Sequence, residues 1–367
     1  MVYASSPVNL AQLETWCRVT LPEKGAHSVS VNEGAIRSIS VIVPMYNAEP
    51  TIERCLAPLL AMRERGEIDE IIVVDDGSTD GSSKIVRSRP SVLLVATEAQ
   101  SGPAAARNLG ARIATGTYLW FVDVDVVVAQ DAARVLRASC ERTGAAAIIG
   151  SYDDRPRAKN FLSQYKNLVH HYYHHCGKQH ASTFWAGCGA VERAVFLELG
   201  GFDAKRYRYP SIEDIDFGYR LRDAGGRIVL EPALQGRHLK EWRFVNLVHT
   251  EIFRRALPWS RLMLKRKDFT DDLNLGKGER ARAVLALATM AATVVWAFGR
   301  LDGWVVAILL AILLAANIGF LAFFIRTRGP VFAVRALLFH QFYYAYSSVA
   351  FAVATAEHYL DRVKETP

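Results

Sequence analysis

The sequence predicts an α/β domain with a doubly wound, mostly parallel sheet, followed by apolar helices. Two observations predict this fold class. Residues 38–240 alternate short apolar runs, typical of buried parallel strands, with helix-like segments. From Ala283 the chain becomes strongly apolar, which indicates a separate region with different surroundings. Residues 1–37 are mixed in character and weakly patterned, so we expect them to form an N-terminal extension.

Four apolar runs are expected to be strands of the sheet, with helix-like segments between them. The runs are Ser40–Pro44, Ile71–Val74, Val92–Val95 and Tyr118–Val122. Thr51–Met62 reads as the first connecting helix, and Gly102 opens a helix whose small residues allow close packing on the sheet. This βαβαβαβ order gives a doubly wound layer. Because ligands bind at the carboxyl ends of strands in such sheets, polar residues after these runs are the candidate site.

Asp123 and Asp125 directly follow the run Tyr118–Val122. On an extended backbone, residues i and i+2 point the same way, so the two carboxylates repel unless a cation lies between them. A hard divalent cation prefers carboxylate oxygen and tolerates substrate phosphates as further ligands. The pair therefore predicts a metal–diphosphate site, with a solvated strand end as the alternative.

Other polar residues at this edge have two interpretations each. The carboxylates of the turn Asp75–Gly81 suit helix capping or recognition of a base or ribose. Arg107 is either a surface residue or a bidentate donor to an aspartate or phosphate, and Asn47 is either a site residue or a turn residue. Glu213 and Asp214 precede a helix-like run, where the helix dipole favours acidic residues in any case.

Six motifs, in this order, resemble the signature of family 2 glycosyltransferases, which are inverting enzymes with the A-type glycosyltransferase fold. They are Val-Ile-Val-Pro-Met-Tyr-Asn (41–47), Val-Asp-Asp-Gly-Ser-Thr-Asp (74–80), Gly-Pro-Ala-Ala-Ala-Arg-Asn (102–108), Asp-Val-Asp (123–125), Gly-Gly-Phe-Asp (200–203) and Ile-Glu-Asp-Ile-Asp (212–216). The resemblance covers residues 38–240, which we expect to be a single catalytic domain. It implies a nucleotide-sugar donor, usually a nucleoside diphosphate sugar, and a divalent metal, Mg²⁺ or Mn²⁺.

The resemblance, together with the charge of neighbouring side chains such as Arg107 and Lys240, gives the expected site residues. The nucleotide-sugar site would comprise Pro44, Tyr46, Asn47, Asp76, Arg107, Asp123 and Lys240. The metal would be held by Asp125, Asp123 and His238. Within these sets, the loop Pro44–Asn47 and Asp76 would hold the nucleotide base. Asp123 would contact the ribose, and Asp125 would coordinate the metal on the diphosphate.

The expected chemistry needs a further carboxylate. Loss of a nucleoside diphosphate builds negative charge that a metal stabilises, and the acceptor hydroxyl needs a general base on the opposite face of the sugar. By resemblance Asp214 is the expected base, with Glu213 as the alternative or as an orienting residue. Trp185 and Trp242 are assigned to the acceptor side. The Gln-x-x-Arg-Trp motif of processive members is absent from the sequence, which argues against a processive polymerase.

The run His170–Cys176 holds histidines at i and i+4 spacing, which share helix faces and suit a metal. The sequence has no matching second cluster, so an aromatic, His-rich helix near the acceptor entrance is the preferred interpretation over a structural zinc site. The five cysteines are scattered and predict neither a disulfide framework nor zinc ligands, which fits a reduced environment.

Two uncharged segments predict a transmembrane hairpin, 283–299 and 304–325, within a membrane region at 281–367. A third apolar segment, 331–356, carries charged and aromatic residues, and 241–280 reads as a basic, aromatic interfacial linker. The alternative is a buried hairpin in a soluble domain. Basic residues flank the hairpin on both sides, which by the positive-inside tendency predicts a cytoplasmic catalytic domain.

Together these features predict a multi-pass, membrane-anchored hexosyltransferase that acts on a lipid or lipid-linked acceptor at the cytoplasmic face. The net charge of +7 permits contact with phosphates or an anionic membrane, and we expect no nucleic acid partner. Two rival classes are a sugar-1-phosphate nucleotidyltransferase and a catalytically silent membrane scaffold. The first lacks its expected glycine-rich phosphate loop here, and intact Asp123, Asp125 and Asp214 argue against the second.

Overall fold

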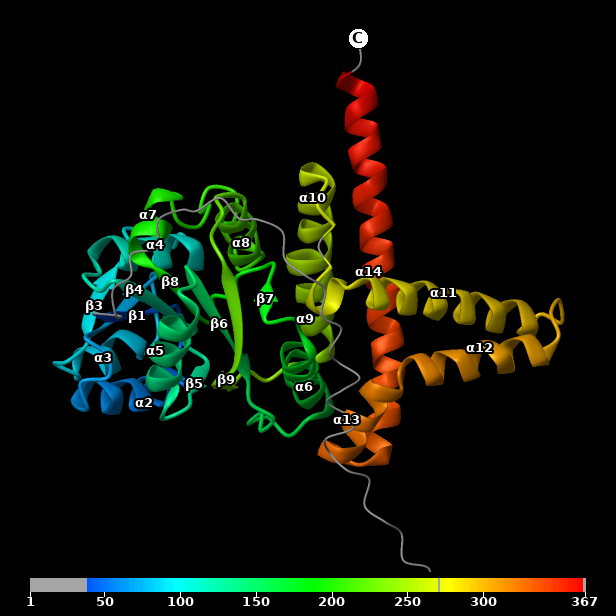
Figure 1. The fold of residues 1–367 in the computed structure, drawn as a ribbon, viewed down its shortest axis with the longest axis horizontal. Coiled ribbons are helices and arrows are strands. Elements are labelled where there is room, and N and C mark those ends of the chain that lie inside the picture. The colour runs from blue at the N-terminus through cyan, green and yellow to red at the C-terminus, as the bar shows by residue number, and fades with distance from the viewer. Residues whose placement is uncertain (1–37, 270, 366–367) are drawn as a thin grey trace, which may run out of the picture.

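The computed structural model describes residues 38–269 and 271–365, so the predicted extension at 1–37 lies outside the described residues. A nine-stranded sheet forms the centre of the first domain, in the order β3-β2-β1-β4-β8-β6-β9-β5, with β7 paired to β9 (Figure 1). A group of helices from the last third of the chain lies beside this domain in Figure 1.

The first half of the sheet is parallel, as predicted. Its strands are β1 (Ile39–Met45), β2 (Glu70–Asp75), β3 (Leu93–Ala96) and β4 (Tyr118–Val122). The connecting helices are α2 (Ile52–Glu64), α3 (Ser82–Arg87) and α4 (Pro103–Ile113). Strands β1 and β4 are buried along their whole length, which explains why they read as continuous apolar runs.

The second half of the sheet differs from the prediction of a mostly parallel sheet. Its strands are β5 (Val126–Val128), β6 (Ala147–Tyr152), β7 (His180–Ala181), β8 (Cys188–Glu192) and β9 (Ile228–His238). Strand β8 lies antiparallel between β4 and β6, and β9 is antiparallel to β5 and β7 but parallel to β6. The sheet is therefore mixed, because β8 enters it in reverse between two forward-running strands.

Both faces of the sheet are covered by helices. Val41 and Val43 of β1 face a core shared with α2 and α5 (Ala132–Thr143), whereas Ile42 faces the opposite core. That second core is rich in phenylalanine and packs against α4, α7 (Arg193–Glu198) and α8 (Glu213–Asp223). Phe121 of β4 contacts the rings of Phe196 and Phe202, and Phe217 of α8 contacts the same two rings, so α8 packs on the side of the strand that leads to Asp123.

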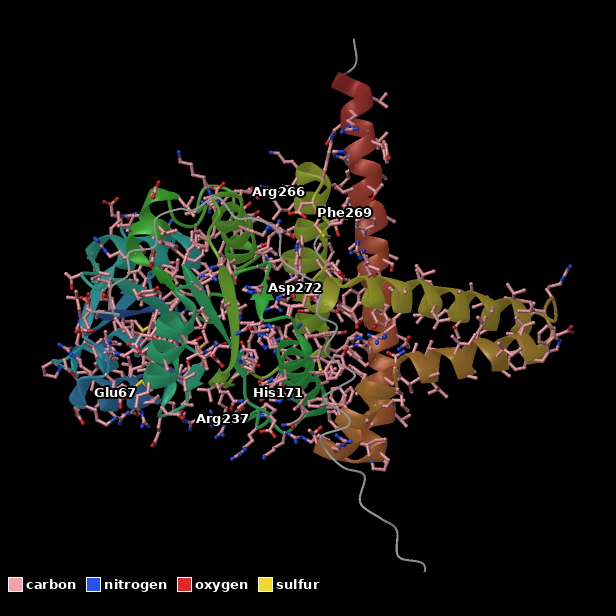
Figure 2. The ribbon with its side chains drawn as sticks, in the orientation of Figure 1. Glu67, His171, Arg237, Arg266, Phe269 and Asp272 are labelled. Atoms are coloured by element: carbon pink, nitrogen blue, oxygen red, sulfur yellow. The ribbon has the colours of Figure 1, made fainter. Side chains whose placement is uncertain are left out.

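The C-terminal third is helical. Its elements are α9 (Phe244–His249), the π-helical turn η1 (Thr250–Ala256), α10 (Leu257–Arg266), the 3₁₀ turn η2 (Leu273–Leu275), α11 (Lys277–Ala297), α12 (Gly303–Ala316), α13 (Ile318–Arg328) and α14 (Pro330–Glu365). In Figure 1, α10 runs beside the long α14, and α11 and α12 form a hairpin that projects away from the sheet domain. Asp272, labelled in Figure 2, accepts a 2.6 Å hydrogen bond from the Ser182 backbone and so joins η2 to the sheet domain.

The predicted pair of straight membrane spans is only partly present. Among the described residues, α11 alone is long and apolar enough to cross a membrane, and a second candidate exists only if α12 and α13 count as one span. These two helices meet at Asn317 with a bend of 64°. The helices therefore do not support a multi-pass membrane protein.

The bend has a packing reason. Phe320 and Phe324 of α13 turn back to bury against Tyr165 of α6 (Phe161–Cys176) and against Ala336 of α14. A straight continuation of α12 would leave this aromatic face away from α6. By contrast, only 11% of the most apolar 18-residue stretch of α11 is buried, so most of this helix surface is exposed.

Candidate active site

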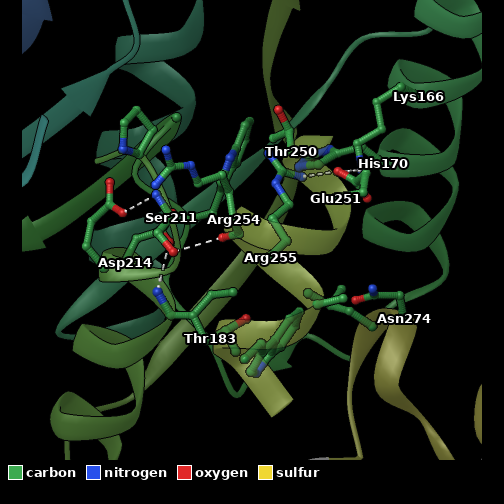
Figure 3. Close-up of a pocket in the computed structure, with 18 of the residues that line it drawn as sticks. Lys166, His170, Thr183, Ser211, Asp214, Thr250, Glu251, Arg254, Arg255 and Asn274 are labelled. Atoms are coloured by element: carbon green, nitrogen blue, oxygen red, sulfur yellow. Dashed lines mark hydrogen bonds and ion pairs between the residues drawn. The ribbon is translucent and has the colours of Figure 1, made fainter. Parts of the chain in front are cut away.

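A cavity of about 1150 Å³ begins at the carboxyl ends of β1, β2 and β4 and continues to the C-terminal helices. Pro44, Tyr46, Asp76, Asp123 and Asp125 line its first part. Its other walls come from α6, η1, α11 and α14 (Figure 3). The cavity thus joins the predicted strand-end site to the region that was predicted to hold the acceptor.

Arg107 on α4 ties two predicted site residues together. Its guanidinium donates to Asp123 at 2.6 Å and to Glu213 at 2.9 Å. Arg107 and Glu213 are both buried, so their charges compensate each other away from bulk water. Of the two interpretations of Arg107, the structure shows the ion pair with carboxylates, which fixes α8 relative to the end of β4.

Asp125 faces a histidine instead. Nε2 of His238 lies 3.4 Å from Oδ2 of Asp125, and the imidazole stacks on the ring of Tyr152. Pairing of β5 with β9 brings the two residues together, and the Leu239 N–H donates to the Asp125 carbonyl at 2.8 Å. Although burial raises the pKa of Asp125, the neighbouring His238 and Lys240 hold it lowered.

Two of the three residues predicted to hold a metal lie together at the end of the sheet. The described part of the chain holds no group of three or more His, Cys, Asp or Glu side chains arranged around one metal position. Asp123 is engaged by Arg107, which leaves Asp125 and His238 as the available pair. One carboxylate and one imidazole suit a cation that completes its shell with water and substrate phosphates, as Mg²⁺ does.

Asp214 lies at the N-terminus of α8 and lines the cavity, whereas Glu213 next to it is held by Arg107. The Asp214 carboxylate accepts hydrogen bonds from the backbone N–H groups of Ala186 at 3.0 Å and Ile215 at 2.9 Å. Burial, followed by the charge of Glu213, raises the pKa of Asp214 to about 7. In the described chain Asp214 forms no ion pair, so the two neighbouring carboxylates have different environments.

The residues predicted to hold the nucleotide base of the donor fall into two groups. Pro44 and Tyr46 line the cavity directly. Asp76 also lines it, but its carboxylate accepts hydrogen bonds from Thr97 and from the backbone of Ser101 and Gly102. Asp76 therefore fixes the loop that leads into α4.

Asn47 does not line this cavity. Its backbone is left-handed, with a φ of 45°, and its side chain accepts a 2.8 Å hydrogen bond from the Thr79 N–H. Of the two interpretations, the structure favours the turn residue, which shapes the loop that presents Tyr46.

Lys240, Trp242 and Trp185 all line the cavity. The Lys240 ammonium lies 4.2 Å from the centre of the Trp242 ring. Trp185 packs edge-on against Tyr152. The Trp242 ring centre lies 6.4 Å from that of His238, and Tyr152 contacts both Trp185 and His238.

The histidine run forms part of α6, and this helix borders the cavity. Its side chains stack in pairs, His170 on His174 and His171 on His175, with ring centres 3.8 Å apart. His171 and His174 each donate Nδ1–H to a carbonyl of β6. Burial lowers the pKa of His174 to about 4, so it is neutral and serves packing, and the described residues do not form the alternative zinc site.

Several cavity residues were not singled out from the sequence as site residues. They are Tyr152, Lys166, Glu251, Arg254 and Arg255. The two arginines belong to the basic segment that was predicted to face a membrane surface, but in the structure they point into the cavity (Figure 3). The charged pair Lys166 and Glu251, 2.9 Å apart, joins α6 to η1.

Comparisons with known proteins agree with this geometry. Residues 40–200 match the model of "Glycosyl transferase family 2". The uncharacterized glycosyltransferase EpsJ of Bacillus subtilis is 44% identical over 90 residues, which cover 24% of this chain and 26% of that protein. The pre-mycofactocin glycosyltransferase of Mycobacterium tuberculosis is 26% identical over 241 residues, 61% of this chain and 48% of that protein. The alignments thus span less than half of the length of these relatives.

Among solved structures, the mannosyltransferase PcManGT from Pyrobaculum calidifontis, in complex with GDP-Man and Mn²⁺, superposes with a TM-score of 0.53 and 23% identity. The superposition covers 89% of this chain and 92% of that one, more than residues 38–240 alone could supply. The fold likeness therefore extends into the C-terminal helices. Four of the six motifs, and with them Asp123 and Asp125 of the strand-end site, lie within residues 40–200, the part of the chain that matches the model of this glycosyltransferase family.

Proposed function

We propose that the protein transfers a sugar, with inversion, from a nucleoside diphosphate sugar to an acceptor held in the cavity. The observation that carries this proposal is the contrast between Glu213 and Asp214. Glu213 is neutralised by Arg107, whereas Asp214 faces the cavity without an ion pair among the described residues and has a raised pKa. A base whose pKa lies near the working pH is the most efficient one.

In this proposal the donor lies at the strand ends, beside Tyr46, Asp123 and Lys240. Lys240 would offset charge on the departing diphosphate, and Arg107 would keep Asp123 in place. Asp214 would take the proton from the acceptor hydroxyl on the opposite face of the sugar, and the carboxylate would carry it as an acid afterwards. The bond from the acceptor oxygen to the anomeric carbon forms as the bond to the diphosphate breaks.

A divalent cation, Mg²⁺ or Mn²⁺, would be held by Asp125 and His238 and would stabilise the negative charge of the leaving diphosphate. The donor set of the site supports this assignment, because a carboxylate and an imidazole 3.4 Å apart leave positions for phosphate oxygens.

We also propose that the acceptor is a lipid or lipid-linked molecule and that the α11–α12 hairpin contacts a membrane. Apolar side chains of the hairpin are strongly exposed, among them Val294, Trp296 and Ile308. Exposed apolar surface of this extent marks an interaction site. The cavity reaches α11 at Ala283 and Val284, so an acceptor embedded in a membrane around the hairpin would have a direct path to Asp214.

The first test is metal-dependent thermal stabilisation of the purified full-length protein by nucleoside diphosphates and their sugars. We expect stabilisation that requires Mn²⁺ or Mg²⁺ and that is lost in Asp125→Ala, because this change removes the carboxylate of the Asp125–His238 pair. Asp131→Ala is a matched control, since Asp131 precedes α5 and does not line the cavity. Undiminished metal-dependent stabilisation of Asp125→Ala would refute the metal assignment.

A further inference from the structure

The π-helical turn η1 interrupts the continuous helical segment Phe244–Arg266 where this segment borders the cavity. Turns of this kind widen a helix by one residue and occur frequently at functional sites. Here the turn directs three charged residues, Glu251, Arg254 and Arg255, to the cavity wall. Neither the donor site nor the assigned base uses them.

The charges on this wall do not cancel. Glu251 is shared by two cations, Lys166 at 2.9 Å and Arg255 at 3.5 Å. Arg254 forms no ion pair in the part of the chain that the structure describes, and its guanidinium lies over the Tyr209 ring, 4.6 Å from the centre. Three cations therefore face one carboxylate. A guanidinium stacked on a ring keeps its N–H edge available for an oxyanion.

Both arginines are accessible from the cavity and close to the proposed base. The Arg255 side chain is 47% accessible. Burial lowers the pKa of Arg255, but the charges of Glu251, Tyr152 and Asp214 outweigh it and hold the pKa raised. The Ser211 hydroxyl donates to the Arg254 carbonyl at 2.8 Å, which fixes η1 to the segment that carries Asp214 (Figure 3).

Beyond the arginines the cavity lining becomes more apolar, although Glu279 and Arg280 of α11 also border it. Met263 of α10, Val284 of α11 and Phe351 of α14 line this end, together with Phe269, whose ring lies 6.3 Å from that of Phe351. Val284 is 68% exposed, so this end opens on the apolar surface of the hairpin. The lining therefore changes from the Asp214 carboxylate, through a wall with more cations than carboxylates, to an end with many apolar side chains.

We propose that the acceptor is an amphiphile with an anionic phosphate group, which Arg254 and Arg255 bind, and with a hydrocarbon tail that leaves between α10, α11 and α14. The phosphate is a binding group here, and the reacting hydroxyl lies next to Asp214. This inference rests on the proposed function and specifies its acceptor. Arginine binds phosphate with paired, charge-assisted hydrogen bonds, which a neutral head group cannot replace.

The test uses the full-length protein in a detergent with a neutral maltoside head group. Thermal stabilisation is titrated with dodecyl phosphate, with dodecanol and with inorganic phosphate. We expect dodecyl phosphate to bind at least about tenfold more tightly than either, a difference of about 1.4 kcal/mol. Arg254→Gln and Arg255→Gln should each reduce this preference about tenfold.

Arg261→Gln is the matched control. Arg261 belongs to α10 but pairs with Glu357 at 2.7 Å outside the cavity, so this variant should keep the preference. Equal binding of dodecanol, or a preference that survives in both cavity variants, would overturn the proposal. Inorganic phosphate that binds as tightly as dodecyl phosphate would also overturn it, because the site would then hold free phosphate.

Donor binding separates this inference from the proposed function. Each variant is also tested for metal-dependent stabilisation by nucleoside diphosphate. If Arg254→Gln and Arg255→Gln lose it, the arginines serve the donor diphosphate and the acceptor assignment is wrong. If the variants keep it and the dodecyl phosphate preference, the acceptor assignment is wrong while the donor site stands.

Discussion

Replacement of Asp214 by Asn should abolish most of the transfer while donor binding stays intact. Asn keeps the size of the side chain but cannot accept a proton, and Asp214 makes no contact with the Asp125–His238 pair in the described residues. A general base contributes about 10²–10⁴-fold, or roughly 3–5 kcal/mol of the barrier, so transfer should fall at least about 100-fold. The assay is sugar transfer at saturating donor, with donor affinity measured separately.

The pH dependence of the transfer rate provides a second test of Asp214 as the base. With a pKa of about 7, Asp214 is about one-tenth deprotonated at pH 6 and about nine-tenths at pH 8. The transfer rate should therefore rise about tenfold over this interval in the wild-type protein. The residual rate of Asp214→Asn should not show this rise.

The variant Glu213→Gln tests whether the neighbouring carboxylate is the base. The charge of Glu213 helps to raise the pKa of Asp214, so its removal should move the midpoint of the rate profile to lower pH. It should also lower stability, because Arg107 keeps only Asp123 as a partner. Near-normal turnover of Asp214→Asn together with a dead Glu213→Gln would refute our assignment of the base.

Further predictions concern stability and the membrane. The pKa of Asp214 is about 7 in the folded protein, above its ordinary value of 3.8. As pH rises from about 4 to 7, the wild-type protein should therefore lose up to about 4 kcal/mol of stability relative to Asp214→Asn, measured as a difference in thermal midpoints. A difference that stays constant with pH would contradict the raised pKa. Arg107→Met should cost about 3–5 kcal/mol, because it leaves Glu213 buried without its cation, and a thermal midpoint unchanged from wild type would contradict this pairing. Val294→Lys should weaken membrane retention by about 3 kcal/mol if α11 lies in lipid, whereas Leu93→Lys on β3, with a similar exposed fraction, should leave retention unchanged; equal retention of the two variants in flotation assays would argue against insertion. Gly102→Ala should destabilise the protein, because Gly102 has a φ of 87° and its Cβ would meet the Arg208 carbonyl, and a wild-type midpoint would refute this.

Much of the first half of the fold could be predicted because local patterns encode it. Strands β1 and β4 are buried on both faces, so they appear as apolar runs, and Asp123 and Asp125 follow directly. The antiparallel half was not predicted, because β5 and β7 are only three and two residues long and the sequence of β8 does not show that it runs opposite to β4 and β6. The bend at Asn317 was missed for another reason. The uncharged run 304–325 has no breaking residue such as proline, and only the packing of Phe320 and Phe324 on α6 requires the bend.

The two halves of the cavity also differ in whether local sequence or tertiary packing determines their residues. On the donor side, Asp123, Asp125 and Asp214 each stand at the end of a strand or the start of a helix, where a short motif is sufficient to identify them. Resemblance favours Asp214 over Glu213, but the residue pattern alone gives no physical reason for this choice, which comes from the ion pair between Arg107 and Glu213.

On the side proposed for the acceptor, the cavity wall combines residues that lie far apart in the chain: Lys166 of α6, Arg255 of η1, Val284 of α11 and Phe351 of α14. Nothing local distinguishes Arg254 and Arg255 from the other basic residues of 241–280. The π-helical turn orients these two arginines toward the cavity, and the packing of α10 against α14 forms the apolar end of the cavity. The residues of the proposed donor site can therefore be identified from local motifs, whereas the wall proposed for the acceptor depends on how the C-terminal helices pack. Variants in η1 should consequently change which acceptor is used without changing which donor is bound.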